Sequence, residues 1–120
     1  MDEKCIPKKI KLLISIVDRG KGQKFTEMYK NNNVKYNLIA LGSGTAESEI
    51  LDYLGLGETE KDIVISIVHE DDVKTIMNNL REKMHLSKPG NGIAFTIPIT
   101  SIDSATTLDY LCSLFNSEKE

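Results

Sequence analysis

The sequence predicts one α+β domain over residues 1–120, in which two βαβ units interleave into a four-stranded antiparallel sheet with helices on one face. The length of 120 residues suits one domain. Apolar runs of strand type alternate along it with amphipathic helical patterns. The run Leu13–Val17 is echoed by Val64–Val68, and an acidic turn and a helical pattern follow each. Two such units commonly form the ferredoxin-like βαββαβ arrangement.

The first half of the chain has the pattern of a strand, a helix and a second strand. The expected elements are, in that order, Lys11–Val17, Gln23–Asn31 and Val34–Leu41. The helix places Phe25, Met28 and Tyr29 on one side, which predicts that this side is buried. Three asparagines follow and are expected to end the helix.

The second half repeats this order, with one insertion before it and one helix after it. The expected elements are a short helix over Ala46–Leu54, a strand over Asp62–Val68, a helix to about His85, a strand over Ile93–Ile99 and a C-terminal helix over 104–116. Asp71 or Asp72 is expected to cap the helix that ends near His85, because a carboxylate accepts hydrogen bonds from the first N–H groups of a helix. The domain core is expected to span about residues 8–102.

The two echoing strands are apolar on both faces. Along Leu12–Val17 and Ile63–Val68, only Ser15 and Ser66 interrupt the apolar side chains. A sheet with one wet face alternates apolar and polar residues, and the helices can cover only one face. A second copy of the chain is the simplest cover for the other face, so the pattern predicts a homo-oligomer.

Composition and charge exclude several classes of partner. The net charge is −3 and tryptophan is absent, so neither a basic face nor stacking aromatics point to nucleic acid. No apolar run has membrane-spanning length, so membrane insertion is not expected. Residues Met1–Cys5 lack a signal-like apolar run, and Cys5 and Cys112 lack metal spacing. We therefore expect a cytoplasmic protein with reduced thiols.

Two glycine-containing segments beside predicted strands form the candidate ligand-binding site. Its residues are Gly42, Ser43, Gly44 and Thr45 after one strand, and Lys88, Gly90, Asn91 and Gly92 before another. Glycine lets backbone N–H groups approach an anion closely. Arg19 and Lys21, in the turn after the first strand, are candidate contacts for that anion. The alternative is an ordinary helix C-cap and turn, which glycine also serves.

No residue pattern indicates catalysis or metal binding. His69 and His85 stand far from cysteines and carboxylates at metal spacing, and both are expected on the surface. No serine or cysteine has a recognisable nucleophile elbow or a paired base. We therefore expect a binding protein rather than an enzyme, with neither catalytic nor metal-ligating residues.

The second glycine segment and the strand after it resemble the nitrogen-regulatory P-II signal proteins. That family has a K-x-G-D-G loop before a strand of pattern I-F-V-x-P-V. The matching residues here are Lys88, Gly90, Asn91 and Gly92 in the loop, and Phe95, Pro98 and Ile99 in the strand. The turn Gly42–Gly44 resembles the G-F-G that opens the family's effector loop. The resemblance covers roughly residues 8–102.

The resemblance implies a ferredoxin-like homotrimer whose sheets face inward. It also implies ligand clefts between subunits, walled by the two glycine segments, that sense an adenine nucleotide as small-molecule effector. A loop would then dock onto a protein target in nitrogen regulation. Two other functions on the same architecture stay open: a divalent-cation-tolerance-type trimer and a small enzyme.

The chain departs from the family where phosphate charge is neutralised. Ile93 replaces a lysine, Thr45–Glu47 replaces a basic stretch, and Ser104–Thr107 stands where two arginines would be. A triphosphate needs cations or charge-assisted donors to offset its charge. A less charged nucleotide, a small anion or no nucleotide therefore remains an alternative to ATP.

Overall fold

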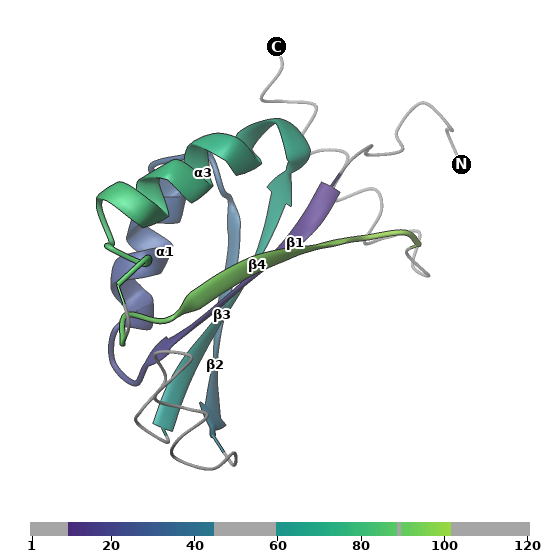
Figure 1. Cartoon of the computed structure of the whole chain (residues 1–120). Helices are drawn as coiled ribbons and strands as arrows, with labels where there is room; N and C mark the ends of the chain where they lie inside the picture. Colours follow the sequence, from purple (N-terminus) through teal and green to yellow (C-terminus); the bar gives the residue numbers. More distant parts are fainter. Residues whose placement is uncertain (1–9, 45–59, 89, 102–120) are drawn as a thin grey trace.

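The computed structural model describes residues 10–44, 60–88 and 90–101, which form an antiparallel sheet with helices on one face (Figure 1). Its elements are β1 (Ile10–Asp18), α1 (Gly22–Lys30), β2 (Tyr36–Ser43), β3 (Glu60–His69), α3 (Glu70–Glu82) and β4 (Ile93–Pro98). The strand order is β2-β3-β1-β4, and every pairing is antiparallel. The predicted α+β, ferredoxin-like fold is confirmed. The helices expected over 46–54 and 104–116 lie outside the described residues.

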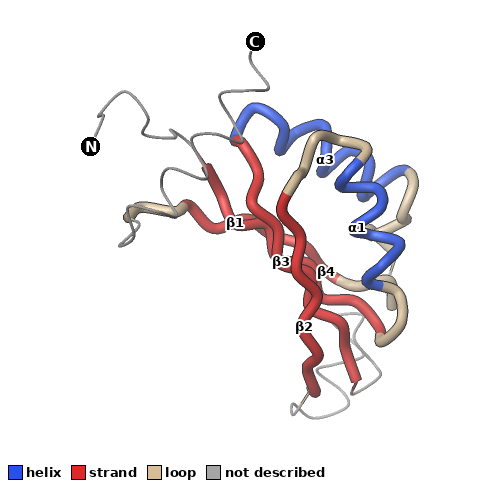
Figure 2. The backbone as a smooth tube through the Cα atoms, turned by 180° about the vertical axis from the view of Figure 1, so that it is seen from behind, coloured by secondary structure: helices blue, strands red, loops and turns tan. Residues whose placement is uncertain are grey.

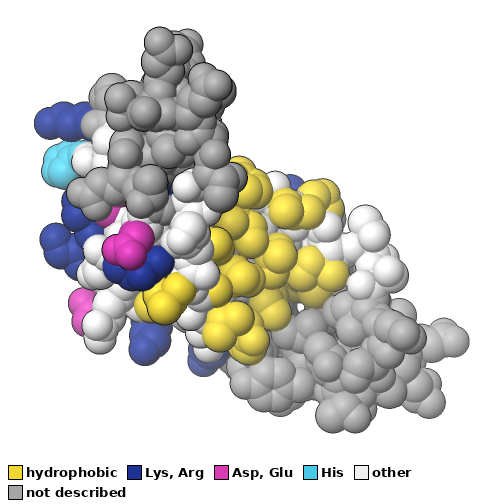
Figure 3. All heavy atoms as spheres, turned by 90° about the horizontal axis from the view of Figure 1, so that it is seen from below, with side chains coloured by type: hydrophobic (Ala, Val, Ile, Leu, Met, Phe, Trp, Pro, Cys, Tyr) yellow, Lys and Arg dark blue, Asp and Glu magenta, His cyan; other side chains and the backbone are white. Residues whose placement is uncertain are grey.

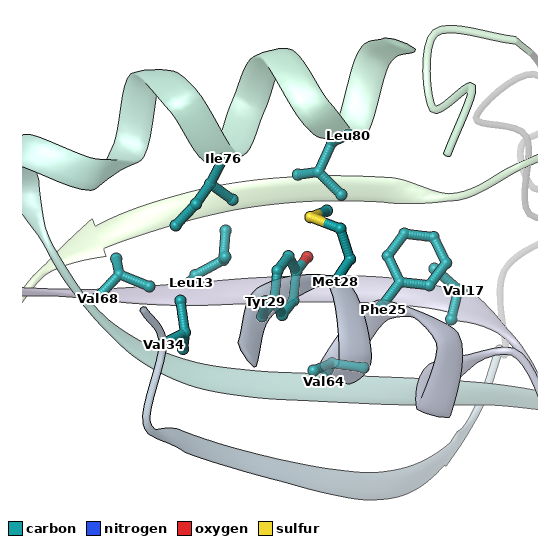
Figure 4. Packing of buried hydrophobic residues seen from close by; sticks show 10 residues of the cluster. All are labelled: Leu13, Val17, Phe25, Met28, Tyr29, Val34, Val64, Val68, Ile76 and Leu80. Carbon is teal, nitrogen blue, oxygen red and sulfur yellow. The ribbon is translucent and has the colours of Figure 1, made fainter. Parts of the chain in front are cut away.

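The hydrophobic core lies between the sheet and the two helices, which Figure 2 shows on the same side of the strands. Its residues are Leu13, Val17, Phe25, Met28, Tyr29, Val34, Val64, Val68, Ile76 and Leu80 (Figure 4). Alternate residues of β1 and β3 enter the core because side chains of a strand point to opposite faces in turn. The predicted apolar side of α1 is buried at Phe25, Met28 and Tyr29.

Two serines stand on the helix-facing side of the central strands, and both are fully buried. The Ser15 hydroxyl is hydrogen-bonded to the Tyr29 hydroxyl, and the Ser66 hydroxyl donates to Asn37 Oδ1 at 2.6 Å. Burial raises the pKa of Tyr29 to about 12, an effect that the hydrogen bond from Ser15 partly offsets. The polar groups are therefore satisfied inside an otherwise apolar layer.

We expect the buried Tyr29 to make stability fall at high pH. The tyrosine ionises near pH 10 when unfolded and at about 12 when folded, so its contribution is complete below pH 10 and is lost as the pH rises through 12. The loss approaches about 2.7 kcal/mol. Urea unfolding of the wild type and of Tyr29→Phe at pH 8, 10 and 11.5 measures it. Parallel curves for the two proteins would contradict the assignment.

The start of α3 differs from the expectation. His69 Nδ1 accepts a hydrogen bond from the Asp71 N–H at 3.1 Å, so His69 caps the helix and the predicted capping by Asp71 or Asp72 is wrong. The His69 side chain is 14% exposed, so this residue lies only partly at the surface. The reason is that β3 runs without a loop into α3, which leaves His69 as the last extended residue.

The face of the sheet opposite the helices is apolar in three rows that cross all four strands. In strand order, the rows are Tyr36, Ile67, Leu12 and Ile97; Leu38, Ile65, Ile14 and Phe95; and Ala40, Ile63, Ile16 and Ile93. Figure 3 shows hydrophobic side chains gathered on this face in one patch. The exposure of Leu38 is 48% and that of Phe95 is 41%. The prediction that β1 and β3 are apolar on both sides is confirmed, and the edge strands extend the pattern.

Candidate functional site

The two glycine segments lie at the same end of the sheet but on opposite edges. Gly42 pairs with Lys61 of β3, which pairs in turn with Asp18 at the end of β1. Gly92 immediately precedes β4, which pairs with the other side of β1. Neighbouring strands are about 4.8 Å apart, so about 14 Å separates the two edges. Within one chain the glycine segments therefore do not face each other across a shared cleft.

In the second segment, the fold itself requires one glycine. Gly92 has a φ of +112°, and a Cβ there would lie 2.6 Å from the carbonyl oxygen of Ile16 and 2.8 Å from a methyl group of Val17. Gly90 has a φ of +92° but nothing within 4 Å of the Cβ position. Gly92 thus lets the loop pack against β1, whereas Gly90 and the exposed Lys88 face open space.

We expect Gly92→Ala to lower the free energy of unfolding by more than about 2 kcal/mol, because both the backbone conformation and the contact with β1 resist a methyl group. Gly90→Ala is the matched control, since it meets the same left-handed backbone without a clash. Its cost should be nearer about 1 kcal/mol. Chemical denaturation of the two variants measures the difference, and equal losses would contradict the packing role of Gly92.

The first glycine segment is held by Arg19. The guanidinium donates from Nη2 to the Gly42 carbonyl at 2.8 Å and from Nε to the Lys61 carbonyl at 3.2 Å. The backbone N–H of Arg19 donates to the Glu60 carbonyl at 3.2 Å. Arg19 therefore links the end of β2 to the start of β3, which flank residues 45–59. Thr45 lies outside the described residues.

A buried carboxylate supports this arrangement. Asp62 Oδ2 accepts hydrogen bonds from the backbone N–H groups of Gly20 at 2.9 Å and Gly22 at 3.0 Å. Asp62 Oδ1 lies 3.4 Å from Arg19 Nε. The carboxylate thus fixes the turn between β1 and α1 and faces the guanidinium that reaches the first glycine segment.

A second ion pair lies beside the first. Lys61 Nζ is 2.7 Å from Asp18 Oδ1, and the Lys61 side chain is only 4% exposed. Sequence reasoning missed both Lys61 and Asp62. The available signal was that Lys61-Asp62 begins one long apolar strand and Asp18-Arg19 ends another. Charged pairs at matching ends of two antiparallel strands indicate cross-strand ion pairs.

Lys21 belongs to a different group from Arg19. It lines a pocket that also includes Lys24, Lys83 and Asn91. The Asn91 side chain donates to the His85 carbonyl at 2.8 Å, which ties the second glycine segment to the end of α3. Arg19 and Lys21 therefore point in different directions from the turn after β1. Arg19 contacts the first glycine segment, and Lys21 lines the pocket that includes Asn91 of the second glycine segment.

Neither a metal cluster nor a membrane span is found in the part of the chain that the structure describes. Within residues 10–44, 60–88 and 90–101, no three His, Cys, Asp or Glu side chains are arranged to hold a metal ion. None of the described helices is both long enough and apolar enough to cross a membrane.

Comparison with known proteins identifies the fold. No family model and no curated protein matches the sequence. CPII, a nitrogen regulatory PII-like protein from Thiomonas intermedia K12 bound to ADP, AMP and bicarbonate, is similar with a TM-score of 0.58 and 18% identity, over 79% of this chain and 94% of CPII. CutA1 from Oryza sativa is similar with a TM-score of 0.63 and 14% identity, over 90% of this chain and 92% of CutA1.

A plant protein adds a third comparison. Arabidopsis thaliana PII bound to citrate has a TM-score of 0.59 and 17% identity, over 82% of this chain and 85% of the plant protein. At these identities the likeness establishes architecture. The chain has the fold that PII-like signalling proteins and CutA1 share.

Proposed function

We propose that the chain is a cytoplasmic PII-like regulatory protein that assembles as a homotrimer and binds a small anionic ligand between its subunits. The observation that carries the proposal is the apolar outer face of the sheet. A patch that crosses all four strands costs free energy in water, so it favours a partner surface. Another copy of the chain could cover this face with its own apolar face. Closed rotational symmetry would keep the number of copies in the assembly small and fixed.

The positions of the glycine segments favour a ligand cleft between subunits. They lie at one end of the sheet on opposite edges, so a cleft walled by both requires the β2 edge of one copy and the β4 edge of another. Gly90 and Lys88 would supply backbone N–H groups and a cation from one side. Gly42, Ser43, Gly44 and Thr45 would contribute from the other side.

The proposed ligand is an adenine nucleotide of low charge or another small anion. CPII is bound to ADP, AMP and bicarbonate, and Arabidopsis PII is bound to citrate. Two of the five N–H donors of Arg19 are engaged with carbonyls, which leaves others for a ligand near Gly42. Because Ile93 brings no charge, we expect ADP and AMP to bind more tightly than ATP.

The proposed output is regulation of a protein target, with nitrogen regulation as the process. Residues 45–59 join β2 to β3 at the points that Arg19 links. A ligand that contacts Arg19 or the first glycine segment would act directly on the strand ends that residues 45–59 connect. The function is one of ligand binding and signalling, without catalysis.

Calorimetric titration of the purified oligomer with ADP, AMP, ATP and bicarbonate tests the proposal. We expect AMP to bind once per chain and Lys88→Gln to weaken it about tenfold, the effect of losing one charge-assisted contact. Lys74→Gln, on an exposed position of α3, is the matched control and should bind like the wild type. A folded oligomer that binds none of the four ligands would overturn the ligand-sensing function.

A second candidate is a divalent-cation-tolerance-type trimer, and the likeness to CutA1 is the observation in its favour. It shares the assembly but not the nucleotide cleft. Titration of the metal-free protein with Cu²⁺ and Zn²⁺, monitored by calorimetry, distinguishes the two candidates. Saturable metal binding without AMP binding would favour this second function.

A further inference from the structure

We propose that a basic pocket in the helix layer, separate from the cleft between subunits, binds a small molecule through a diphosphate group. The pocket has a volume of about 420 Å³, within the range of small-molecule sites. Its polar lining comprises Lys21, Lys24, Lys83, His85 and Asn91. All lining residues come from one chain, and of the second glycine segment only Asn91 is among them, so this proposal does not rest on the proposed assembly or nucleotide cleft.

The three lysines come from separate elements and converge without neutralising partners. Lys21 precedes α1, Lys24 lies in its first turn, and Lys83 follows the end of α3. Among the described residues, none of the three ammonium groups has a hydrogen bond or ion pair, and no carboxylate lines the pocket. Like charges repel one another, so a bound anion would stabilise the cluster.

The overall charge of the chain does not account for this cluster. The net charge is −3, with carboxylates more numerous than lysines and arginines. Figure 3 shows Lys and Arg side chains on the flank beside the apolar face, with some Asp and Glu side chains among them. A pocket whose formally charged lining residues are all lysines, in an acidic protein, favours an anionic ligand.

The floor of the pocket is apolar and firmly held. Phe25 is 3% exposed and packs edge-on against Tyr29, with ring centroids 6.5 Å apart. Met84 completes this floor. Lysine ammonium groups act as compact charges that suit phosphate oxygens, and the apolar floor suits the uncharged part of the ligand. A diphosphate, with two to three negative charges, matches three lysines.

The rim of the pocket has an uncommon backbone conformation. His85 has a φ of 54°, in the left-handed region that few residues other than glycine adopt. Its carbonyl accepts hydrogen bonds from Asn91 Nδ2 at 2.8 Å and from the Lys88 N–H at 3.1 Å. A left-handed residue commonly follows the end of a helix, and His85 lies just beyond the end of α3. Its hydrogen bond from Asn91 holds that side chain beside the end of α3.

Calorimetry with pyrophosphate as the probe tests this site in the full-length protein. We expect the wild type to bind one pyrophosphate per chain at low ionic strength, more weakly as salt is added. Lys24→Gln and Lys83→Gln should each weaken binding about fivefold to tenfold, as expected for loss of one partly exposed charged contact. Circular dichroism of each variant checks that the fold is retained.

Two further variants test whether the loss of binding is specific to the lysines of the pocket. Lys74→Gln removes an exposed lysine of α3 outside the pocket, and Lys88→Gln removes the lysine of the proposed cleft; both should stay within twofold of the wild type. Absence of pyrophosphate binding by the wild type would overturn the proposal. So would equal weakening by Lys74→Gln and Lys83→Gln, or binding lost in Lys88→Gln and kept in Lys83→Gln. None of these outcomes depends on whether AMP, which has no diphosphate, binds in the cleft between subunits.

Discussion

Replacing Ile65 with aspartate should convert the assembled protein into single chains. Ile65 lies in the middle row of the apolar outer face, between Leu38 and Ile14. In an assembly through this face, the new carboxylate would be taken out of water without a partner. The penalty is on the order of 3 kcal/mol or more for each copy of the charge. Light scattering coupled to size-exclusion chromatography measures the mass of each form.

The control for this variant is Thr75→Asp, which adds the same charge on an exposed position of α3. It should elute with the mass of the wild type. Circular dichroism should show that Ile65→Asp keeps its helices and strands, because the core lies on the other face of the sheet. A wild-type protein that is already a single chain at micromolar concentration would contradict assembly through this face.

Asp62→Ala should be the most destabilising change near the glycine segments. Asp62 is 5% exposed and accepts hydrogen bonds from the N–H groups of Gly20 and Gly22, besides facing Arg19. The alanine would leave two N–H groups without their acceptor and Arg19 without its carboxylate partner. We expect a loss of about 3 kcal/mol in the free energy of unfolding, measured by urea denaturation.

Two comparisons separate the hydrogen bonds from the charge of Asp62. Asp62→Asn keeps an acceptor oxygen of the same shape and should lose less stability than Asp62→Ala. Glu82→Ala removes an exposed carboxylate from the end of α3 and should change stability by less than about 0.5 kcal/mol. Equal, small effects of Asp62→Ala and Glu82→Ala would contradict the role assigned to Asp62.

The order of strands and helices was predictable because apolar residues recur in this sequence with the periods of strands and of amphipathic helices. The strand and helix patterns predict β1, α1, β3, α3 and β4 within a few residues. The second strand starts at Tyr36 rather than Val34, because Val34 is buried in the core and donates its N–H to the Tyr29 carbonyl at 3.0 Å. Periodicity identifies an apolar residue but not the tertiary contact that removes it from a strand.

The geometry of the candidate site was less predictable from the sequence. The sequence predicts a ligand contact at Gly92, and the structure adds a packing role against Ile16 and Val17 that no local pattern indicates. Arg19 and Lys21 are separated by one residue, but one holds backbone carbonyls and the other lines a pocket. These assignments depend on contacts between distant segments, which local patterns do not encode.

The pocket that we propose for a diphosphate illustrates the same limit. Lys24 and Lys83 are remote in sequence and join one wall only after α1 and α3 have packed on the sheet. His85 adds a backbone conformation that no composition rule predicts. Fold class and the apolar outer face could be predicted from the sequence, but the convergence of lysines required the structure.

Native mass spectrometry of the wild-type chain with AMP tests the central claim most directly, because it reports copy number and ligand number together. AMP is the informative ligand, since it has no diphosphate for the pocket beside α1 and α3; we predict an assembly of three copies that carries up to three AMP molecules, while single chains released in the same experiment carry none. A single chain that binds AMP as well as the assembly does, or a three-copy assembly that stays free of ligand at saturating AMP, would contradict a nucleotide cleft between subunits.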